Sequence, residues 1–282
     1  MNFKIKTRFV LPINLLALGF SLFCSELMAK DQNPNLFIEN KGQILDQNLK
    51  QNSDLLFLYC GKGYKVQLRK SGYSYEILSY KDLPKINTGD KLHETNEDLL
   101  KTQIKSSRVD IDFFNMNPRP VIIKEEKSED YFNYFTNGIN VSNVHSYKKI
   151  TYQNVFPQTD IEFIITENEA SSFKYNIILR PGADINKVKF LCKGADNISI
   201  NKSELIFQTV NGNMSEKIPF SFYTDKPDEN TEVNFSINNN IISFNANYNK
   251  NKTLIIDPST NRIWGTYYGG SALEYCTSAS ND

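Results

Sequence analysis

The 282-residue sequence has few of the residues on which hydrolases and metal centres depend. It contains two histidines, four cysteines and one tryptophan. Neither His93 nor His145 has a partner at the HExxH or HxH spacing of a metal centre, so we expect surface or packing roles for both. No G-x-S-x-G, P-loop or G-x-G-x-x-G motif is present, and acyl transfer, nucleotide hydrolysis and dinucleotide binding therefore lack their usual marks. We expect a protein that is not an enzyme and uses no cofactor.

The sequence also lacks an excess of charge of either sign, because 32 Lys and Arg balance 32 Asp and Glu. A neutral chain creates no field that would recruit nucleic acid or an anionic membrane. With 13 glycines and 10 prolines it is neither collagen-like nor proline-rich. Aromatic residues are plentiful, with 15 Tyr and 19 Phe. The composition predicts a folded globular protein that has no nucleic-acid partner.

Long hydrophobic runs are missing except at the N-terminus. Three basic residues within the first eight positions precede the apolar run VLPINLLALGFSLFC, and Ala29 stands at the boundary with a polar stretch. This is the pattern of a secretory signal peptide, and the run is too short to span a membrane comfortably. We predict a signal peptide over residues 1–29 with cleavage at Ala29, and no transmembrane segment after it. A lipoprotein anchor at Cys24 is the alternative, although Phe23 is larger than a lipid-attachment site usually accepts.

Beyond Ala29 the sequence has three cysteines, Cys60, Cys192 and Cys276. This odd and sparse set is not a disulfide framework, even in an oxidising compartment. Cys60 and Cys192 both lie in strand-like apolar runs. They either form a bridge with each other or, as we expect, remain buried free thiols.

Strand patterns dominate the sequence beyond the signal peptide. Runs such as RVDIDFF, DIEFIITEN and FKYNIILRPG alternate apolar and polar residues, which is typical of strands with one buried face. Gly, Asn and Asp separate these runs at regular intervals, and Asn-rich turns such as SINNNI suit residues that tolerate positive φ. The pattern predicts an all-β fold over residues 30–258. We expect a β-sandwich of antiparallel sheets with little helix, arranged in one or two packed sheet regions.

One stretch, residues 82–107, breaks the strand pattern because it is polar, charged and poor in β-branched residues. Residues 94–106 within it could form a short helix with Thr95 as its cap. The alternative is a long surface excursion between strands. The stretch could also mark a boundary between an N-terminal sheet region and a C-terminal sandwich.

Carboxylates provide the main candidates for chemistry. Asp110 with Asp112, and Asp160 with Glu162, stand two residues apart on predicted strands, so each pair projects from one face at a separation that a glycosidase could use. The solvated face of a half-buried strand explains them more simply. A second group lies in YTDKPDENTE and could supply hard oxygen ligands to calcium, although it lacks the order of a calcium-binding loop and is more simply a solvated cluster. This group comprises Asp225, Asp228, Glu229 and Glu232.

The stretch EDYFNYFTNGI is unusually rich in aromatic residues. Tyr131 and Tyr134 are candidates for a ligand-facing platform, because aromatic side chains provide large contact areas at low entropic cost. Packing between sheets explains the neighbouring Phe132 and Phe135 equally well.

Six motifs occur in a fixed order along the chain. They are FIENKGQ (37–43), NYFTNGI (133–139), YKKITYQNVFPQTDIEF (147–163), FKYNIILRPGADINKV (173–188), LIIDP (254–258) and WGTYYGG (264–270). Together they resemble the uncharacterised all-β domain that precedes SBBP-type β-propeller repeats in exported bacterial proteins. The likeness runs from Phe37 to the end of the chain. One departure is the motif VFPQTDIEF, where the family has glycine in place of Gln158 or Thr159.

The resemblance implies a protein that is secreted or held on the outer surface of a Gram-negative bacterium. The domain would be a non-enzymatic structural or interaction module ahead of a propeller, and residues 259–282 would begin a truncated first blade. The expected partners are the remainder of that propeller and a surface glycan or protein. A carbohydrate-binding or adhesion module is the alternative, and a degenerate glycosidase comes third. The resemblance implies no catalytic, cofactor-binding or metal-binding residues.

Overall fold

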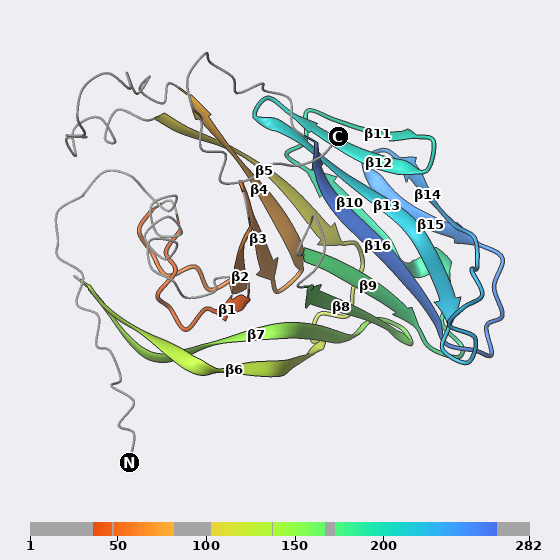
Figure 1. Ribbon diagram of the computed structural model, residues 1–282, viewed down its shortest axis with the longest axis horizontal. Helices are drawn as coiled ribbons and strands as arrows, with labels where there is room; N and C mark the ends of the chain where they lie inside the picture. Colours follow the sequence, from red (N-terminus) through yellow and green to blue (C-terminus); the bar gives the residue numbers. More distant parts are fainter. Residues whose placement is uncertain are drawn as a thin grey trace, which may run out of the picture.

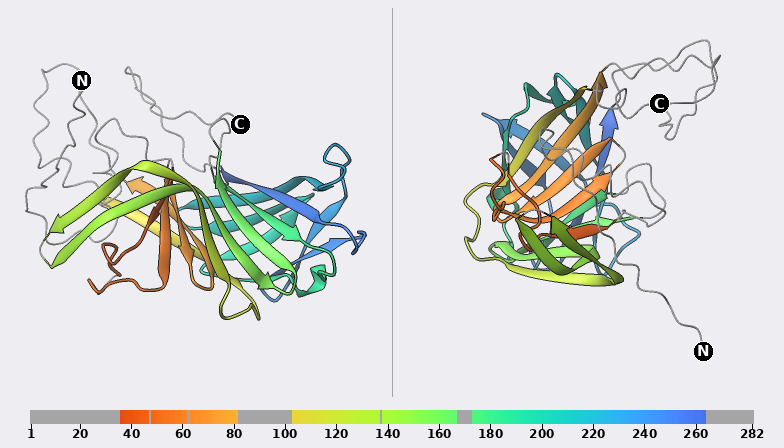
Figure 2. Two further views of the ribbon diagram at one scale, coloured as in Figure 1. Left: turned by 90° about the horizontal axis from the view of Figure 1, so that it is seen from below. Right: turned by 90° about the vertical axis from the view of Figure 1, so that its left-hand side faces the viewer.

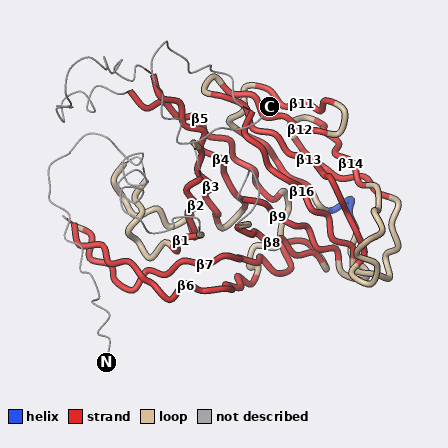
Figure 3. The backbone as a smooth tube through the Cα atoms, viewed as in Figure 1, coloured by secondary structure: helices blue, strands red, loops and turns tan. Residues whose placement is uncertain are grey.

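The computed structural model describes residues 36–46, 48–61, 63–81, 103–136, 138–166 and 173–263. Within these ranges sixteen strands pair in one antiparallel sheet, and a short 3-10 helix, η1 (Ile185–Lys187), interrupts them (Figures 1 and 3). The all-β fold with little helix is therefore confirmed. No helix in the described ranges is long and apolar enough to cross a membrane. Ala29, His93 and the propeller-like residues from 264 onward lie outside the described residues.

The sheet is folded into two layers that both begin at the long strand β7 (Ile139–Phe156). One edge of β7 pairs with β6 (Val121–Thr136). The other edge pairs with β1 (Phe37–Glu39) through Ser146 and Tyr147 and with β8 (Thr159–Ile165) from Lys149 onward. In Figure 1, β6 and β7 run along the bottom of the molecule and the other strands lie above them. The predicted sandwich is thus a single sheet that branches at β7 and not two separate sheets.

The first layer continues from β7 in the order β1-β2-β3-β4-β5-β10-β15-β14. Its strands span Phe37–Glu39 (β1), Leu55–Gly61 (β2), Tyr64–Arg69 (β3), Gly72–Lys81 (β4), Gln103–Phe113 (β5), Lys189–Lys193 (β10), Ile241–Ala246 (β15) and Val233–Asn238 (β14).

The second layer continues from β7 in the order β8-β9-β16-β13-β12-β11, and its last strand comes close to β14 of the first layer. Its strands span Thr159–Ile165 (β8), Phe173–Leu179 (β9), Leu254–Ile263 (β16), Gly212–Tyr223 (β13), Glu204–Thr209 (β12) and Asn197–Asn201 (β11). Figure 2 shows the crossing of the layers from two further directions.

The polar stretch at residues 82–107 does not divide the described structure into two sheet regions. β4 ends just before this stretch and β5 begins within it at Gln103, and the two strands pair continuously from Gly72 with Asp112 to Lys81 with Gln103. The helix expected over residues 94–106 is wrong for residues 103–106, because these residues are held in β5 by their pairing with β4. Residues 82–102 lie outside the described ranges.

Aromatic rings fill the space between the layers. Tyr73 of β4 contacts Phe163 of β8 and Phe173 of β9, with ring centroids 5.6 and 6.4 Å apart. Phe113 of β5 contacts Phe156 at the end of β7. Such pairs contribute about 0.5–1.5 kcal/mol each beyond the burial of their area. The high aromatic content is therefore used largely to join the two layers.

Two hairpin turns place residues other than glycine in the left-handed region of positive φ. β14 and β15 are joined by Asn239 and Asn240, which have φ of 48° and 62°. A two-residue hairpin turn requires positive φ, so the expectation for the Asn-rich turn is confirmed. Between β7 and β8, Gln158 has φ of 56° and follows Pro157. This is a position at which the resemblance calls for glycine, and the glutamine accepts a left-handed conformation that costs about 1–2 kcal/mol.

Cys60 and Cys192 do not pair with each other. Cys192 in β10 is a free thiol in the main core, which confirms the expectation for that residue. Cys60 in β2 belongs to a separate small cluster with Ile44, Leu55 and Leu58. The expectation of a free thiol is wrong for Cys60, which is disulfide-bonded. The two cysteines lie in different apolar clusters, which explains why neither can reach the other.

Candidate functional site

The interior contains a polar cluster around Glu216 of β13, which is buried between the two layers. The hydroxyls of Tyr73 and Tyr75 on β4 donate to its Oε1 over 3.2 and 2.7 Å. The hydroxyl of Tyr175 on β9 donates to Oε2 over 2.8 Å. The Tyr75 hydroxyl also lies 3.2 Å from Oγ1 of Thr260 on β16. These bonds join β4 of the first layer to three strands of the second.

Burial governs the electrostatics of this cluster. It raises the pKa of Glu216 above the ordinary value, while the tyrosine hydroxyls act in the opposite direction by stabilising the carboxylate. Burial, and then the charge of Glu216, raises the pKa of Tyr75 and Tyr175 well above the usual range. Burial likewise raises the pKa of Cys192 to about 12, so its thiol is not an activated nucleophile. The cluster is enclosed and internally bonded, which suits a structural role.

The two carboxylate pairs considered for glycosidase chemistry do not converge. Asp110 and Asp112 lie on β5 in the first layer, whereas Asp160 and Glu162 lie on β8 in the second. The residues between and beside them on both strands face the core. Because side chains alternate along a strand, each pair projects from the outer face of its own layer. The two pairs therefore point away from each other.

Each carboxylate pair is also engaged by neighbouring groups. Asp112 accepts hydrogen bonds from Arg69 and Lys193 over 2.6 and 2.8 Å. Burial alone would raise the pKa of Asp112, but the bonds from Lys193 and Arg69 outweigh burial and hold this pKa below its ordinary value. Asp160 is paired with Arg180. A general acid needs a raised pKa, so Asp112 is poorly suited to that role.

Tyr131 and Tyr134 lie in different surroundings on β6. Tyr131 is 38% exposed and its ring contacts that of His145 at 5.9 Å. Tyr134 is 9% exposed and packs in a small apolar cluster with Val144. The register of β6 against β7 shifts between Lys127 and Tyr131 and again between Phe132 and Tyr134, so an irregularity of the strand separates the two tyrosines. A platform shared by both tyrosines is therefore not formed.

Three of the four carboxylates considered as calcium ligands, Asp225, Glu229 and Glu232, have separate partners. Asp225 is bonded to Lys252, and Glu229 is bonded to Lys226. Glu232 accepts from the side chain of Asn234 over 2.8 Å. Among the described residues, no three His, Cys, Asp or Glu side chains gather as a metal site would require.

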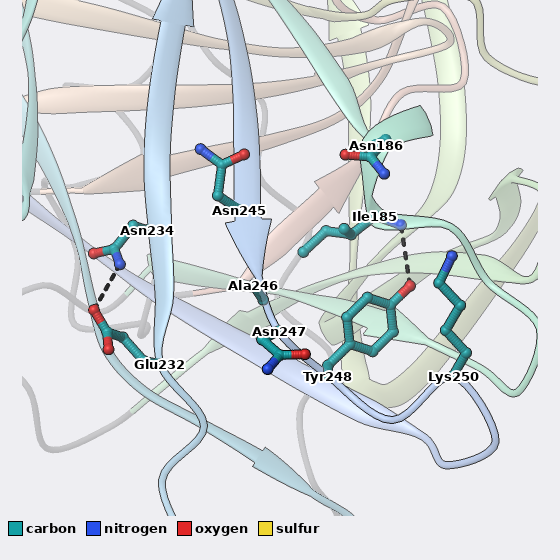
Figure 4. A pocket seen from close by; sticks show the side chains of 9 residues that line it. All are labelled: Ile185, Asn186, Glu232, Asn234, Asn245, Ala246, Asn247, Tyr248 and Lys250. Carbon is teal, nitrogen blue, oxygen red and sulfur yellow. Dashed lines mark hydrogen bonds between the residues drawn. The ribbon is translucent and has the colours of Figure 1, made fainter.

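Glu232 instead lines a hollow of about 560 Å³ near η1, at the adjoining ends of β14 and β15. Figure 4 shows side chains from three segments around it. Asn234 comes from β14 and Asn245 from the end of β15, and Asn247 and Tyr248 follow directly after β15. A second hollow of about 140 Å³ adjoins the first, because Glu232 and Asn234 line both. Its wall includes Ser221 and Asn230, beyond the residues drawn in Figure 4.

Hydrogen bonds hold the wall of the larger hollow in place. The Tyr248 hydroxyl donates to the carbonyl of Ala183 over 2.8 Å and accepts from the backbone N–H of Ile185 over 3.1 Å. The carbonyl of Lys250 accepts from the N–H of Gly182 over 2.8 Å. The segment after β15 is thus fixed to the segment before η1, and the hollow is preformed.

Several polar groups in these hollows have hydrogen-bonding capacity that the described protein does not use. The side-chain amides of Asn245 and Asn247 make no hydrogen bond with any described residue. Ser221 is fully buried, yet its Oγ has no partner among the described residues. The sequence patterns missed this site, because its asparagines are typical of turns and Glu232 stands in a cluster of charges.

Comparison with known families places the chain in one of them. Residues 37–259, from β1 into β16, match the model of a domain of unknown function, DUF7948. The chain belongs to this all-β family. No curated protein and no solved structure matches it.

Proposed function

We propose that this domain is a non-enzymatic structural and interaction module of an exported protein, and that it precedes and holds a β-propeller. The position of β16 carries the proposal. This strand pairs with β13 along one edge, from Leu254 to Ile263, and with β9 along the other. The chain passes from β16 directly into the motif WGTYYGG (264–270), whose resemblance to the start of a propeller blade is the reason for naming a propeller.

β16 is paired on both edges up to Ser259 and with β13 alone from Thr260 to Ile263, so the next segment of the chain departs from a strand that is anchored in the sheet. Leu254 and Ile256 of β16 are fully buried in the core. Thr260 lies beside the cluster around Glu216 and is itself buried. Moving β16 would therefore break hydrogen bonds on both sides and open the core. Such rigidity suits a domain that orients the domain after it, since flexible junctions allow relative motion.

The alternatives have weaker support in their original form. A carbohydrate-binding face made of Tyr131 and Tyr134 requires both to be exposed, and Tyr134 is buried. A degenerate glycosidase requires the carboxylates of β5 and β8 to face a common cleft, and they lie on the outer faces of different layers.

Antibodies raised against the described domain would test export in the native host. We expect them to label intact cells and to detect a product in which propeller repeats come after the domain. Leu16→Arg, in the apolar N-terminal run, should leave the protein in the cytoplasm. Val210→Arg is the matched control, because this side chain is 85% exposed and the variant should be exported normally. Cytoplasmic wild-type protein would contradict the proposal.

A flexible glycine–serine linker inserted after Ile263 in that product would test the holding role separately. Export should persist, because the signal peptide is unchanged. The propeller repeats should become more sensitive to protease, since their point of departure is no longer fixed. Unchanged resistance to protease would show that the domain does not hold the propeller repeats.

A further inference from the structure

We propose that the two adjoining hollows at β14, β15 and η1 bind a neutral oligosaccharide. This site is separate from the proposed propeller contact. Ser221 in the smaller hollow pairs with Ile256 near the start of β16, whereas the propeller-like motif comes after Ile263 at the other end of the strand. The inference therefore goes beyond the proposed function and does not depend on it.

The strand register gathers amide groups on one surface. Asn234 and Asn245 are direct cross-strand partners in β14 and β15. Side chains of such partners lie on the same face, about 5 Å apart at Cβ. Glu232 comes two residues before Asn234, and Asn247 comes two residues after Asn245. In an antiparallel pair these positions lie toward the same end, and both residues line the same hollow. The wall therefore presents three amides and one carboxylate side by side.

Amides suit sugar hydroxyls because each amide both donates and accepts, as does each hydroxyl. The amides of Asn245 and Asn247 are free of other described side chains and can bond adjacent hydroxyls of one sugar ring. The Asn234 amide donates to Oε1 of Glu232, which leaves the carbonyl oxygen of Asn234 and Oε2 of Glu232 to accept from ligand hydroxyls.

The charges in the hollow favour a neutral ligand. Glu232 is the one carboxylate and Lys250 the one ammonium group among its lining residues. The Lys250 ammonium lies 3.8 Å from Oδ1 of Asp184, which partly compensates its charge. A phosphate is usually held by several cations or backbone N–H groups, and calcium by several carboxylate or carbonyl oxygens. Neither arrangement is present among the lining residues.

Tyr248 contributes through its ring. Its hydroxyl is already engaged by Ala183 and Ile185, and its ring packs partly on the main core. The ring edge and face that line the hollow are therefore held in one orientation. A fixed aromatic surface can support the C–H face of a sugar ring without losing side-chain entropy on binding.

The smaller hollow indicates a ligand longer than one sugar. It shares Glu232 and Asn234 with the larger hollow, so one ligand can occupy both. Ser221 and Asn230 are among its other lining residues. The Oγ of Ser221 is enclosed by the protein, so the extension to a second sugar unit rests on the two residues that both hollows share.

NMR of the side-chain amides provides the test. The probes are neutral hexasaccharides of glucose, mannose, galactose, xylose and N-acetylglucosamine, each added to about 10 mM because open polar sites bind weakly. For at least one probe we expect the amide signals of Asn234, Asn245 and Asn247 to shift while that of Asn140, on β7, does not. The corresponding monosaccharide should bind more weakly. Absence of shifts with all five probes would overturn the proposal.

Two variants locate the binding. The double variant Asn245→Ala/Asn247→Ala should raise Kd by about tenfold or more, because two ligand-bonding groups are lost. Asn140→Ala is the matched control and should leave Kd unchanged, since its side chain is exposed away from the hollow. Binding that survives in the double variant would overturn the site. Calcium chloride and sodium phosphate serve as competing probes, and shifts of the same signals at lower concentrations than any sugar would overturn the assignment of ligand class.

Discussion

Glu216 in the interior and the asparagines at and just after the end of β15, Asn245 and Asn247, are all polar residues of the sheet region, but their hydrogen bonding differs. Glu216 accepts three bonds from tyrosine hydroxyls. Asn245 and Asn247 make none through their side chains with the described residues. A buried polar group left without partners costs about 1–3 kcal/mol, whereas water supplies the missing bonds at a surface. The comparison separates polar groups that hold the fold from polar groups that remain available to a ligand.

Ser221 stands between these two cases. It is buried like Glu216, yet its hydroxyl has no partner among the described residues, like the amides of the larger hollow. Ser221 lines the smaller hollow, but its Oγ is enclosed by the protein, so this hydroxyl is neither bonded like Glu216 nor available to a ligand like the amides.

The largest effect on stability is expected from Glu216→Leu, which removes the hydrogen bonds of the interior cluster. The variant deprives the hydroxyls of Tyr73, Tyr75 and Tyr175 of their acceptor inside the core. We expect the free energy of unfolding to fall by at least about 3 kcal/mol, since each buried hydroxyl left unsatisfied costs about 1–3 kcal/mol. Urea denaturation would measure this. Glu216→Gln keeps an acceptor and should be much less destabilised; equal losses in the two variants would contradict the role given to the hydrogen bonds.

A smaller effect should appear in the pH dependence of wild type against Glu216→Gln. The folded-state pKa of Glu216 is raised by burial, so the folded protein binds this proton more tightly than the unfolded chain does. Wild type should therefore lose stability relative to Glu216→Gln as pH rises from the unfolded carboxyl pKa, about 4.3, to the raised folded value. Above that window the difference should be constant. Denaturation across this range would show it, and a wild type that gains stability relative to Glu216→Gln as pH rises would have the wrong sign.

The smallest effect on stability is expected for Asn245→Ala/Asn247→Ala, which removes the two surface amides that make no hydrogen bond with the described residues. These side chains are exposed and make no hydrogen bond with the described residues. The free energy of unfolding should change by no more than about 0.5 kcal/mol. A loss of more than about 2 kcal/mol in urea denaturation would mean that these amides support the fold.

The alternation of apolar and polar residues predicted which segments form strands, but it did not predict which strands pair with each other. The alternation in DIEFIITEN and FKYNIILRPG matches β8 and β9, and the turn at Asn239 and Asn240 is explained by residue type. The branching of the sheet at β7 has no such explanation, because the pairing of β1 with Ser146 and Tyr147 joins segments that are far apart in sequence. No local signal encodes such a contact.

The candidate site was even less visible in the sequence. Glu216 does carry a signal, since it lies in phase with Met214 and Ile218, which face the core, and a charge in an apolar phase requires a partner. The two hollows carry none, because Asn234 and Asn245 become neighbours only through strand register. The same register places Glu232 beside amides and away from the other carboxylates of its turn.

The most direct test of the comparison is the shift in denaturation midpoint that the best-binding hexasaccharide produces in Tyr75→Phe and in Asn247→Ala. A ligand that binds only the folded state raises its stability by RT ln(1 + [L]/Kd), so the shift shrinks as Kd rises. Tyr75→Phe should start about 1–2 kcal/mol less stable and keep the full shift, because only an interior hydrogen bond is lost. Asn247→Ala should start as stable as wild type and lose most of the shift. If both variants lose stability and the shift together, the interior and surface polar groups do not have the separate roles assigned to them.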